Sequence, residues 1–118
     1  MKVSYGLCSD AGKLRANNED NFYVEGQIRE HVETLSVFLR GTAKPGPFLA
    51  AVCDGMGGEE RGEEASLLAV RSLCPSRLEQ VRETAVASVR LANERICGEI
   101  RSQEGKRMGS TLSALYVD

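Results

Sequence analysis

Two acidic segments of this 118-residue chain have the residue types and spacing of a cation site. In the first, Asp54 ends the apolar run FLAAVCD, and the glycine-rich segment GMGGEERG follows directly. A carboxylate at the end of a buried strand needs hydrogen-bond donors or a cation. The glycines allow a sharp turn and leave backbone carbonyls accessible. This mixture of oxygen ligands suits a hard divalent cation such as Mg²⁺ or Mn²⁺.

The second acidic segment lies near the N-terminus and adds an arginine. Glu19 and Asp20 directly precede a predicted strand, and Arg15 comes five residues before Asp20. Acidic side chains hold cations, while the guanidinium of an arginine can bind phosphoryl oxygens through two parallel hydrogen bonds. Together the two segments predict metal-assisted chemistry on a phosphate.

Simpler interpretations of the same residues stay open. Asp54 is also compatible with a tight strand-to-helix turn in which its side chain caps backbone amides. Arg15 by itself is typical of a solvated surface residue. Nucleotide binding is excluded by spacing, because GMGGEERG is not GxGxxG and no GKS or GKT follows. The helix dipole favours acidic residues in a first turn, which accounts for Glu59, Glu60, Glu63 and Glu64.

The surrounding elements follow from hydrophobic periodicity. Residues 33–41 alternate as a half-buried strand does, whereas residues 48–54 are apolar throughout and are expected to form a central strand covered on both faces. The expected strands are 2–9, 21–26, 33–41, 48–54 and 108–118, and the expected helices are 62–73 and about 78–105. The longer helix has an apolar stripe of Leu78, Val81, Ala85, Val89, Ala92, Ile96 and Ile100. Strands followed by two helices and a further strand predict an α+β fold, with the helices on one face of a mainly antiparallel sheet.

Composition narrows the class of protein. The net charge is −2 and the basic residues are scattered, so no nucleic-acid partner is expected. No apolar run is long enough to cross a membrane, and the N-terminus is too polar for a signal peptide. The cysteines show no CxxC spacing, so reduced, buried thiols and a cytoplasmic location are expected for Cys8, Cys53, Cys74 and Cys97.

Three segments, SDAGKLRANNEDNFYV, AVCDGMGGEERGEEAS and RMGSTLSALYVD, carry a family resemblance. In order and interval they resemble successive motifs of the metal-dependent type 2C protein serine/threonine phosphatases, in their bacterial form. The resemblance covers the whole chain. It implies that residues 1–118 are the amino-terminal half of one catalytic domain, without an internal boundary. The implied fold is an antiparallel β-sandwich flanked by paired helices.

The resemblance also implies a role for each candidate residue. Asp54 matches the aspartate that bridges two metal ions, and Gly55 matches a glycine whose carbonyl is a metal ligand. Asp20 matches an aspartate that holds a metal directly or through water, with Glu19 in the outer coordination shell. Arg15 matches the arginine that binds the substrate phosphate. The segment Gly109–Thr111 is interpreted as structural support.

The implied activity is hydrolysis of phosphoserine and phosphothreonine in proteins, with two Mn²⁺ or Mg²⁺ ions activating the attacking water. Many eukaryotic members have a histidine after the Asp-Gly pair, where this chain has Met56. The single histidine, His31, lies in a polar segment and is expected at the surface. The general acid is therefore unassigned, with a metal-bound water as the candidate.

Later motifs of the family, which supply further carboxylates, do not occur in these 118 residues. This chain is therefore expected to be inactive by itself and to expose the edge of its final strand, through which it would self-associate or bind the missing half. The alternative function is a non-catalytic, phosphatase-like module that binds a phosphoprotein or another partner.

Overall fold

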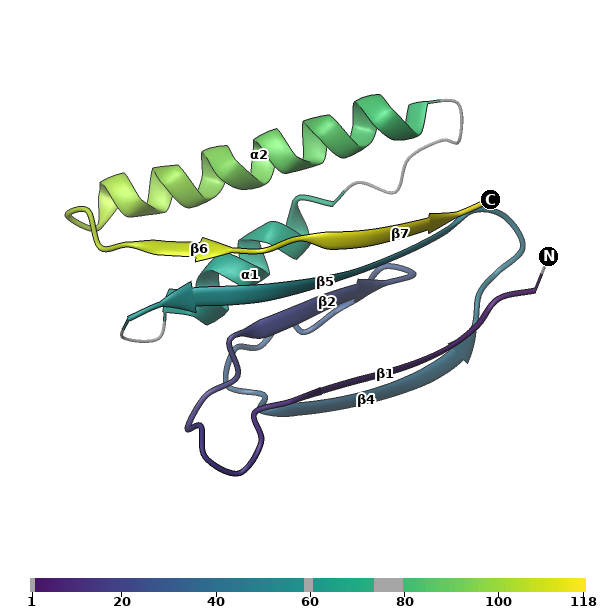
Figure 1. Cartoon of the computed structure of the whole chain (residues 1–118), viewed down its shortest axis with the longest axis horizontal. Coiled ribbons are helices and arrows are strands. Elements are labelled where there is room, and N and C mark those ends of the chain that lie inside the picture. The colour runs from purple at the N-terminus through teal and green to yellow at the C-terminus, as the bar shows by residue number, and fades with distance from the viewer. Residues whose placement is uncertain (1, 59–60, 74–79) are drawn as a thin grey trace.

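The computed structural model describes residues 2–58, 61–73 and 80–118. Within these ranges, two helices follow five strands, and two short strands come after the helices (Figure 1). The elements are β1 (Ser4–Asp10), β2 (Asp20–Val24), β3 (Gln27–Ile28), β4 (Ser36–Thr42), β5 (Phe48–Gly57), α1 (Arg61–Arg71), α2 (Val81–Ser102), β6 (Met108–Ser110) and β7 (Ser113–Val117). Neither helix is long and apolar enough to span a membrane.

The strands form two antiparallel sheets. β1 and β4 pair along their whole lengths, from Ser4 opposite Thr42 to Asp10 opposite Ser36. The larger sheet has the order β3-β2-β5-β6, and β7 pairs with the first half of β5 on the same side as β6. β5 is therefore the central strand, as predicted.

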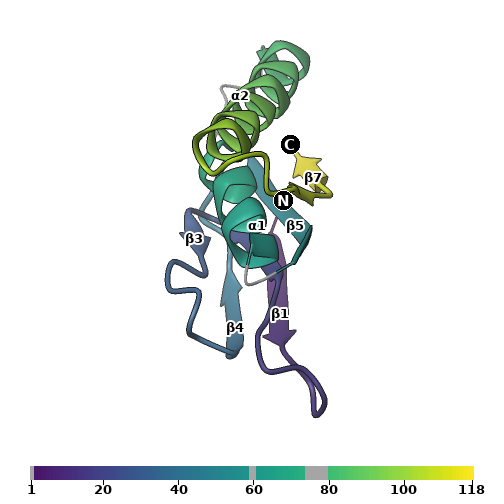
Figure 2. The same cartoon turned by 90° about the vertical axis from the view of Figure 1, so that its left-hand side faces the viewer.

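Alternating side chains of β2 build two cores on opposite faces of the larger sheet. Phe22 and Val24 pack with Phe48 against side chains of the β1–β4 sheet. Tyr23 points the other way, into a cluster with Val70 of α1. Both helices lie on the same side of β5 and β7 (Figure 2). The layers are thus helices, larger sheet and smaller sheet, which confirms the α+β prediction.

The prediction that β5 is covered on both faces is wrong from Val52 onward. Phe48 and Ala50 lie in the core between the sheets, but Val52 is 59% exposed and Met56 is 67% exposed. The apolar sequence reflects the helix-side core, where Ala51 and Cys53 are buried. On the other face, the two-stranded sheet covers only the first part of β5.

The predicted strand 108–118 is interrupted between β6 and β7. At the interruption, the Thr111 amide donates to the Asp54 carbonyl at 2.9 Å, and the Asp54 amide donates to Thr111 Oγ1 at 3.0 Å. The hydroxyl takes a place in the ladder that a backbone carbonyl would otherwise fill.

The expected strand 21–26 is shorter and is followed by an unpredicted hairpin. Glu25 and Gly26 have φ values of 50° and 82°, and together they form the two-residue turn between β2 and β3. Such turns favour Asn-Gly or Asp-Gly. Glutamate at the first position carries no turn signal, so the predicted strand continues through the turn.

Both helices occur where predicted, but the apolar stripe of α2 is only partly covered. Ala92 is buried and Ile96 is half-buried, whereas Ala85 is exposed and Val89 is 53% exposed. α1 has 11 residues and α2 has 22, so α1 is too short to cover the whole of its neighbour. Residues 74–79, which include Leu78 of the predicted stripe, lie outside the described ranges.

The cysteines depart from the expectation of buried thiols at one position. Cys53 is buried and Cys97 is half-buried, but Cys8 is exposed on β1. All three are free thiols, and Cys74 lies outside the described residues. Cys8 is exposed because successive residues of β1 alternate between the core side and solvent.

Candidate metal and phosphate site

Pairing of β2 with β5 brings the two predicted aspartates together. The antiparallel register places Asp20 directly opposite Asp54. The start of β2, the second half of β5 and the β1–β2 loop lie at the same end of the molecule (Figure 1). There, a cleft of about 250 Å³ is lined by Asp10, Ala11, Arg15, Asn17, Asn18, Glu19, Asp20 and Asp54. Predicted residues from both acidic segments therefore share one cleft.

The charge of Asp54 disfavours the ionised form of Asp20. Burial raises the pKa of Asp20, and the charge of Asp54 and a side-chain hydrogen bond with it raise that pKa further. Arg29 acts in the opposite direction and lowers it. Two adjacent carboxylates are stabilised by a shared proton or by a cation. The electrostatics of this pair therefore fit a cation-binding position.

Gly55 lies at the point where three segments of backbone meet. Its amide donates to the Glu19 carbonyl at 3.1 Å. A Cβ at this position would lie 2.5 Å from that carbonyl oxygen and 2.6 Å from the Gly62 carbonyl carbon, and would overlap the Gly62 oxygen. Only glycine fits here, because both neighbours are main chain. The close approach sets the position of Glu19 relative to Asp54.

Glu19 is held at the edge of the cleft against α1. A Cβ added to Gly62 would lie 2.7 Å from Glu19 Cδ, so the glutamate side chain covers this glycine. Glu19 is half-buried and also lines the cleft. Its expected place in an outer coordination shell stays a prediction.

The segment interpreted as structural support contacts the backbone of the site. β6 pairs with the second half of β5, with Ser110 opposite Gly55 and Gly109 opposite Met56. Thr111 is joined to the Asp54 backbone by the two hydrogen bonds described above. These contacts hold the backbone of Asp54 from the side of β5 opposite to β2.

Arg15 is exposed on the β1–β2 loop and lines the same cleft as the aspartates. Within the described part of the chain it has no hydrogen bond or ion pair. Its guanidinium is therefore available for a ligand in the cleft. His31, as predicted, is a surface residue, with a side chain that is 74% exposed and lies 3.8 Å from Glu33.

The candidate ligands have the chemistry that a divalent cation requires. All candidate ligands are oxygen atoms, which fits a hard cation better than zinc or copper. Among the described residues, no group of three or more histidine, cysteine or acidic side chains is placed to hold a metal ion. Asp20 and Asp54 face each other in the cleft, and their place in a metal site, like that of the Gly55 carbonyl, stays a prediction.

Sequence reasoning missed the buried polar residues around the cleft. Asn18 is 3% exposed, Arg29 is 2% exposed, and Glu63 is 3% exposed although it lies in the first turn of α1 as predicted. The Asn17 side chain donates to Glu63. The signal for Asn18 was available, because its side chain accepts the amide of Asp20 two residues on, as in an Asx turn. No sequence signal pointed to Arg29, since it follows a two-residue strand in a polar stretch.

No family model matches the chain. Among curated proteins, it is 30% identical to the serine/threonine protein phosphatase PstP of Mycobacterium tuberculosis, over 98% of this chain and 19% of that protein. It is 29% identical to a putative protein phosphatase 2C-type of Streptococcus pyogenes, over 99% of this chain and 43% of that protein. The chain thus spans less than half the length of these relatives.

Solved structures give the same result. The catalytic domain of PstP in complex with two manganese ions superposes with a TM-score of 0.70 and 28% identity, over 100% of this chain and 45% of that one. The S. agalactiae serine/threonine phosphatase has a TM-score of 0.68 and 26% identity, over 99% of this chain and 44% of that one. In sequence and in fold the chain is therefore similar to the amino-terminal half of a type 2C protein serine/threonine phosphatase catalytic domain.

Proposed function

We propose that the protein carrying this chain hydrolyses phosphoserine and phosphothreonine in proteins with the help of divalent cations. One observation carries the proposal: a single cleft holds two facing aspartates and an exposed arginine that has no hydrogen-bond or ion-pair partner among the described residues. Relatives of the chain are serine/threonine phosphatases, and one of them was solved with two manganese ions. The substrate class and the use of Mn²⁺ or Mg²⁺ are inferred from these relatives.

In this proposal Asp54 would hold both cations, Asp20 and the Gly55 carbonyl would be further ligands, and Glu19 would support them from the outer coordination shell. Bound cations would supply an activated water and offset negative charge that develops on the phosphoryl group. The chain's own contribution is rigid placement. Asp20 and Asp54 are fixed by strand pairing, and Thr111 holds the Asp54 backbone.

Arg15 is assigned to the substrate phosphate. Its planar guanidinium can donate two parallel hydrogen bonds to phosphoryl oxygens and orient them in the cleft. Met56 has no proton to donate, and His31 does not line the cleft. No side chain of this chain is therefore assigned as the general acid.

Replacing Arg15 by alanine is expected to raise KM for a phosphopeptide with little effect on Mn²⁺ affinity. Losing a hydrogen bond to a charged group is worth about 1.5–3 kcal/mol, or roughly ten- to one-hundred-fold in kcat/KM. The measurement is phosphopeptide hydrolysis by the complete domain, meaning this chain continued by the carboxy-terminal half of a type 2C catalytic domain. Lys13→Ala, a neighbouring charge on the same loop, is the matched control. Equal effects of both variants would return Arg15 to the role of a surface residue.

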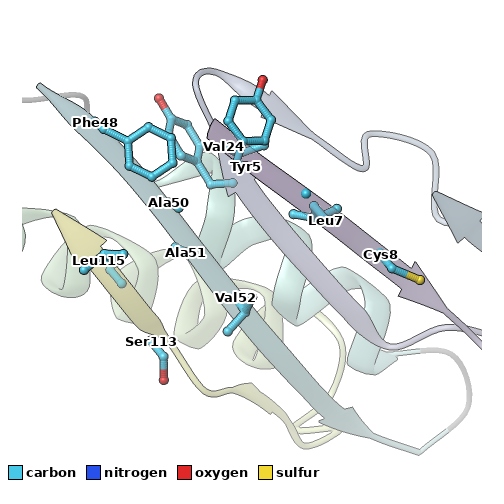
Figure 3. A pocket seen from close by; sticks show the side chains of 13 residues that line it. Tyr5, Leu7, Cys8, Val24, Phe48, Ala50, Ala51, Val52, Ser113 and Leu115 are labelled. Carbon is cyan, nitrogen blue, oxygen red and sulfur yellow. The ribbon is translucent and has the colours of Figure 1, made fainter. Parts of the chain in front are cut away.

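A second candidate function is a non-catalytic interaction module. An apolar groove of about 520 Å³ lies between β1 and β7, with β5 at its floor (Figure 3). Val52 and Leu115 are each 59% exposed on this side of the sheet. Within the described residues β7 pairs only with β5, which leaves its outer edge open. Such a surface is suited to a protein partner.

The 118-residue chain by itself is expected to have little or no phosphatase activity and to self-associate. Two adjacent cations need several carboxylates around them. The described cleft has one close pair of carboxylates, Asp20 and Asp54. The open edge of β7 provides a route to pairing with another copy or with the carboxy-terminal half of a type 2C catalytic domain. The measurements are p-nitrophenyl phosphate hydrolysis at saturating Mn²⁺ and light scattering. A clean monomer with the turnover of the complete domain would contradict this expectation.

We also propose a cytoplasmic location. The free thiols of Cys8, Cys53 and Cys97 support it, because thiols stay reduced in that compartment.

A further inference from the structure

The segment that carries Asp20 into the cleft has little regular structure of its own. Residues 11–19 form the loop between β1 and β2, and β2 begins only at Asp20. The position of the Asp20 carboxylate therefore depends on what holds the end of this loop. The contacts that hold it come from a buried arginine that follows β3 in the sequence.

Arg29 is 2% exposed and directs its guanidinium at backbone carbonyls. Nε and Nη2 donate to the Asp20 carbonyl at 3.2 and 2.7 Å, and Nη2 donates to the Asn18 carbonyl at 2.6 Å. Nη1 donates to the carbonyls of Val32 and Thr34 at 2.9 and 3.1 Å. The planar fork of one guanidinium thus joins the loop before Asp20 to the segment before β4.

Arg29 is itself held in place by Asn21, the residue after Asp20. The Asn21 side chain donates to the Arg29 carbonyl at 2.9 Å and accepts the Arg29 amide at 3.0 Å. Asn18 adds a contact from the other direction, since its Oδ1 accepts the Asp20 amide at 3.0 Å. Both sides of Asp20 are therefore tied to one buried polar network.

The charge of Arg29 is compensated from two sides. Glu63 and Asp20 each favour its charged form electrostatically, against the effect of burial. Glu63 also accepts a hydrogen bond from Asn17, at the other end of the same loop segment. Residues 17–20 thus contact the buried Arg29 at one end and the buried Glu63 at the other.

From these contacts we infer that Arg29 is a positioning residue, which sets the Asp20 carboxylate opposite Asp54 for cation binding. The inference rests on the proposed metal site and goes beyond it, because Arg29 touches neither the cation nor the substrate in this role. A purely structural role would instead stabilise the fold evenly, through the link to Val32 and Thr34. The two roles differ in what happens locally at the cleft.

The first test is amide hydrogen exchange, measured by NMR on the metal-free 118-residue chain. In Arg29→Ala, the amides of Asp20 and Gly55 should exchange about tenfold faster than in a variant of equal global stability, because only the local structure of the cleft opens. Val70→Ala, a core substitution on the helix side, is the control for global stability. Arg29→Lys keeps the charge but lacks the planar fork, so it should fold and show the same local loss.

The second test is a Mn²⁺ titration of the same variants in the complete domain, followed through paramagnetic broadening of the Asp20 and Gly55 amide signals. Loss of a residue that orients a ligand should weaken Mn²⁺ binding about 10–100-fold, while Val70→Ala should bind as the wild type does. Unchanged exchange or unchanged Mn²⁺ affinity in both Arg29 variants would overturn the role of Arg29 alone. A wild-type complete domain that does not bind Mn²⁺ at the cleft would overturn the proposed metal site, and the role of Arg29 with it.

Discussion

Replacing Gly55 by alanine is expected to destabilise the fold by about 3 kcal/mol or more, the upper end of the range for overpacked sites. The new Cβ would lie 2.5 Å from the Glu19 carbonyl oxygen and would overlap the Gly62 carbonyl. Both obstacles are main chain, so no rotamer change relieves them. β5, the Glu19 loop and the start of α1 would have to separate. The measurement is the free energy of unfolding in urea.

Gly98→Ala is the matched control for that experiment. Gly98 lies inside α2, and an added Cβ there has no atom within 4 Å. Alanine is favoured over glycine in a helix interior by about 0.5–1 kcal/mol, so this variant should be more stable than the wild type. Similar, small effects of both substitutions would show that the close packing around Gly55 does not exist in solution.

Asp54→Asn is expected to cause the largest loss of Mn²⁺ affinity of any single substitution in the cleft. A bridging ligand serves two cations, whereas each other proposed ligand serves one. The same substitution should not destabilise the metal-free protein. The charge of Asp54 raises the pKa of Asp20 and so opposes the ionisation of Asp20. Without metal, Asp54→Asn should therefore be at least as stable as the wild type. The measurements are calorimetric Mn²⁺ titration of the complete domain and urea unfolding without metal.

Asp10→Asn is the matched control, because Asp10 lines the same cleft but already accepts a hydrogen bond from Ser36. It should lose far less affinity than Asp54→Asn. Equal affinities of wild type and Asp54→Asn would remove Asp54 from the metal site. Equal losses in the two variants would mean that the cleft attracts cations only through its overall negative charge.

Several of the acidic residues that line the cleft could be singled out from local sequence. A carboxylate that ends an apolar strand, followed by glycines, marks a position where oxygen ligands gather, and Asp54 followed by Gly55 is such a position. From the sequence, the glycines were expected to allow a sharp turn and to leave backbone carbonyls accessible. The structure shows a further reason for Gly55, namely close contact with Glu19 and Gly62. That reason could not be predicted, because Glu19 lies far from Gly55 in the sequence.

Some secondary-structure predictions failed where a tertiary contact overrides the local pattern. The alternation across residues 108–118 indicated one strand, but Thr111 interrupts it by bonding to Asp54. The apolar stripe of α2 marks its apolar face, but the neighbouring helix is too short to cover Val89, which stays exposed. Hydrophobic periodicity reports which face of an element is apolar, and it does not report what lies opposite.

The sequence by itself determined the order of the elements, the α+β class and the residue types of the candidate site, because helix and strand periodicity and loop acidity are local properties of the chain. The tertiary structure alone decided that Asp20 lies opposite Asp54, that Arg15 shares their cleft, and that Arg29 is buried beneath them. A register between strands depends on side-chain packing across the whole sheet. A buried arginine depends on carbonyls from distant segments that converge on it, and such convergence leaves no mark at its own position in the sequence.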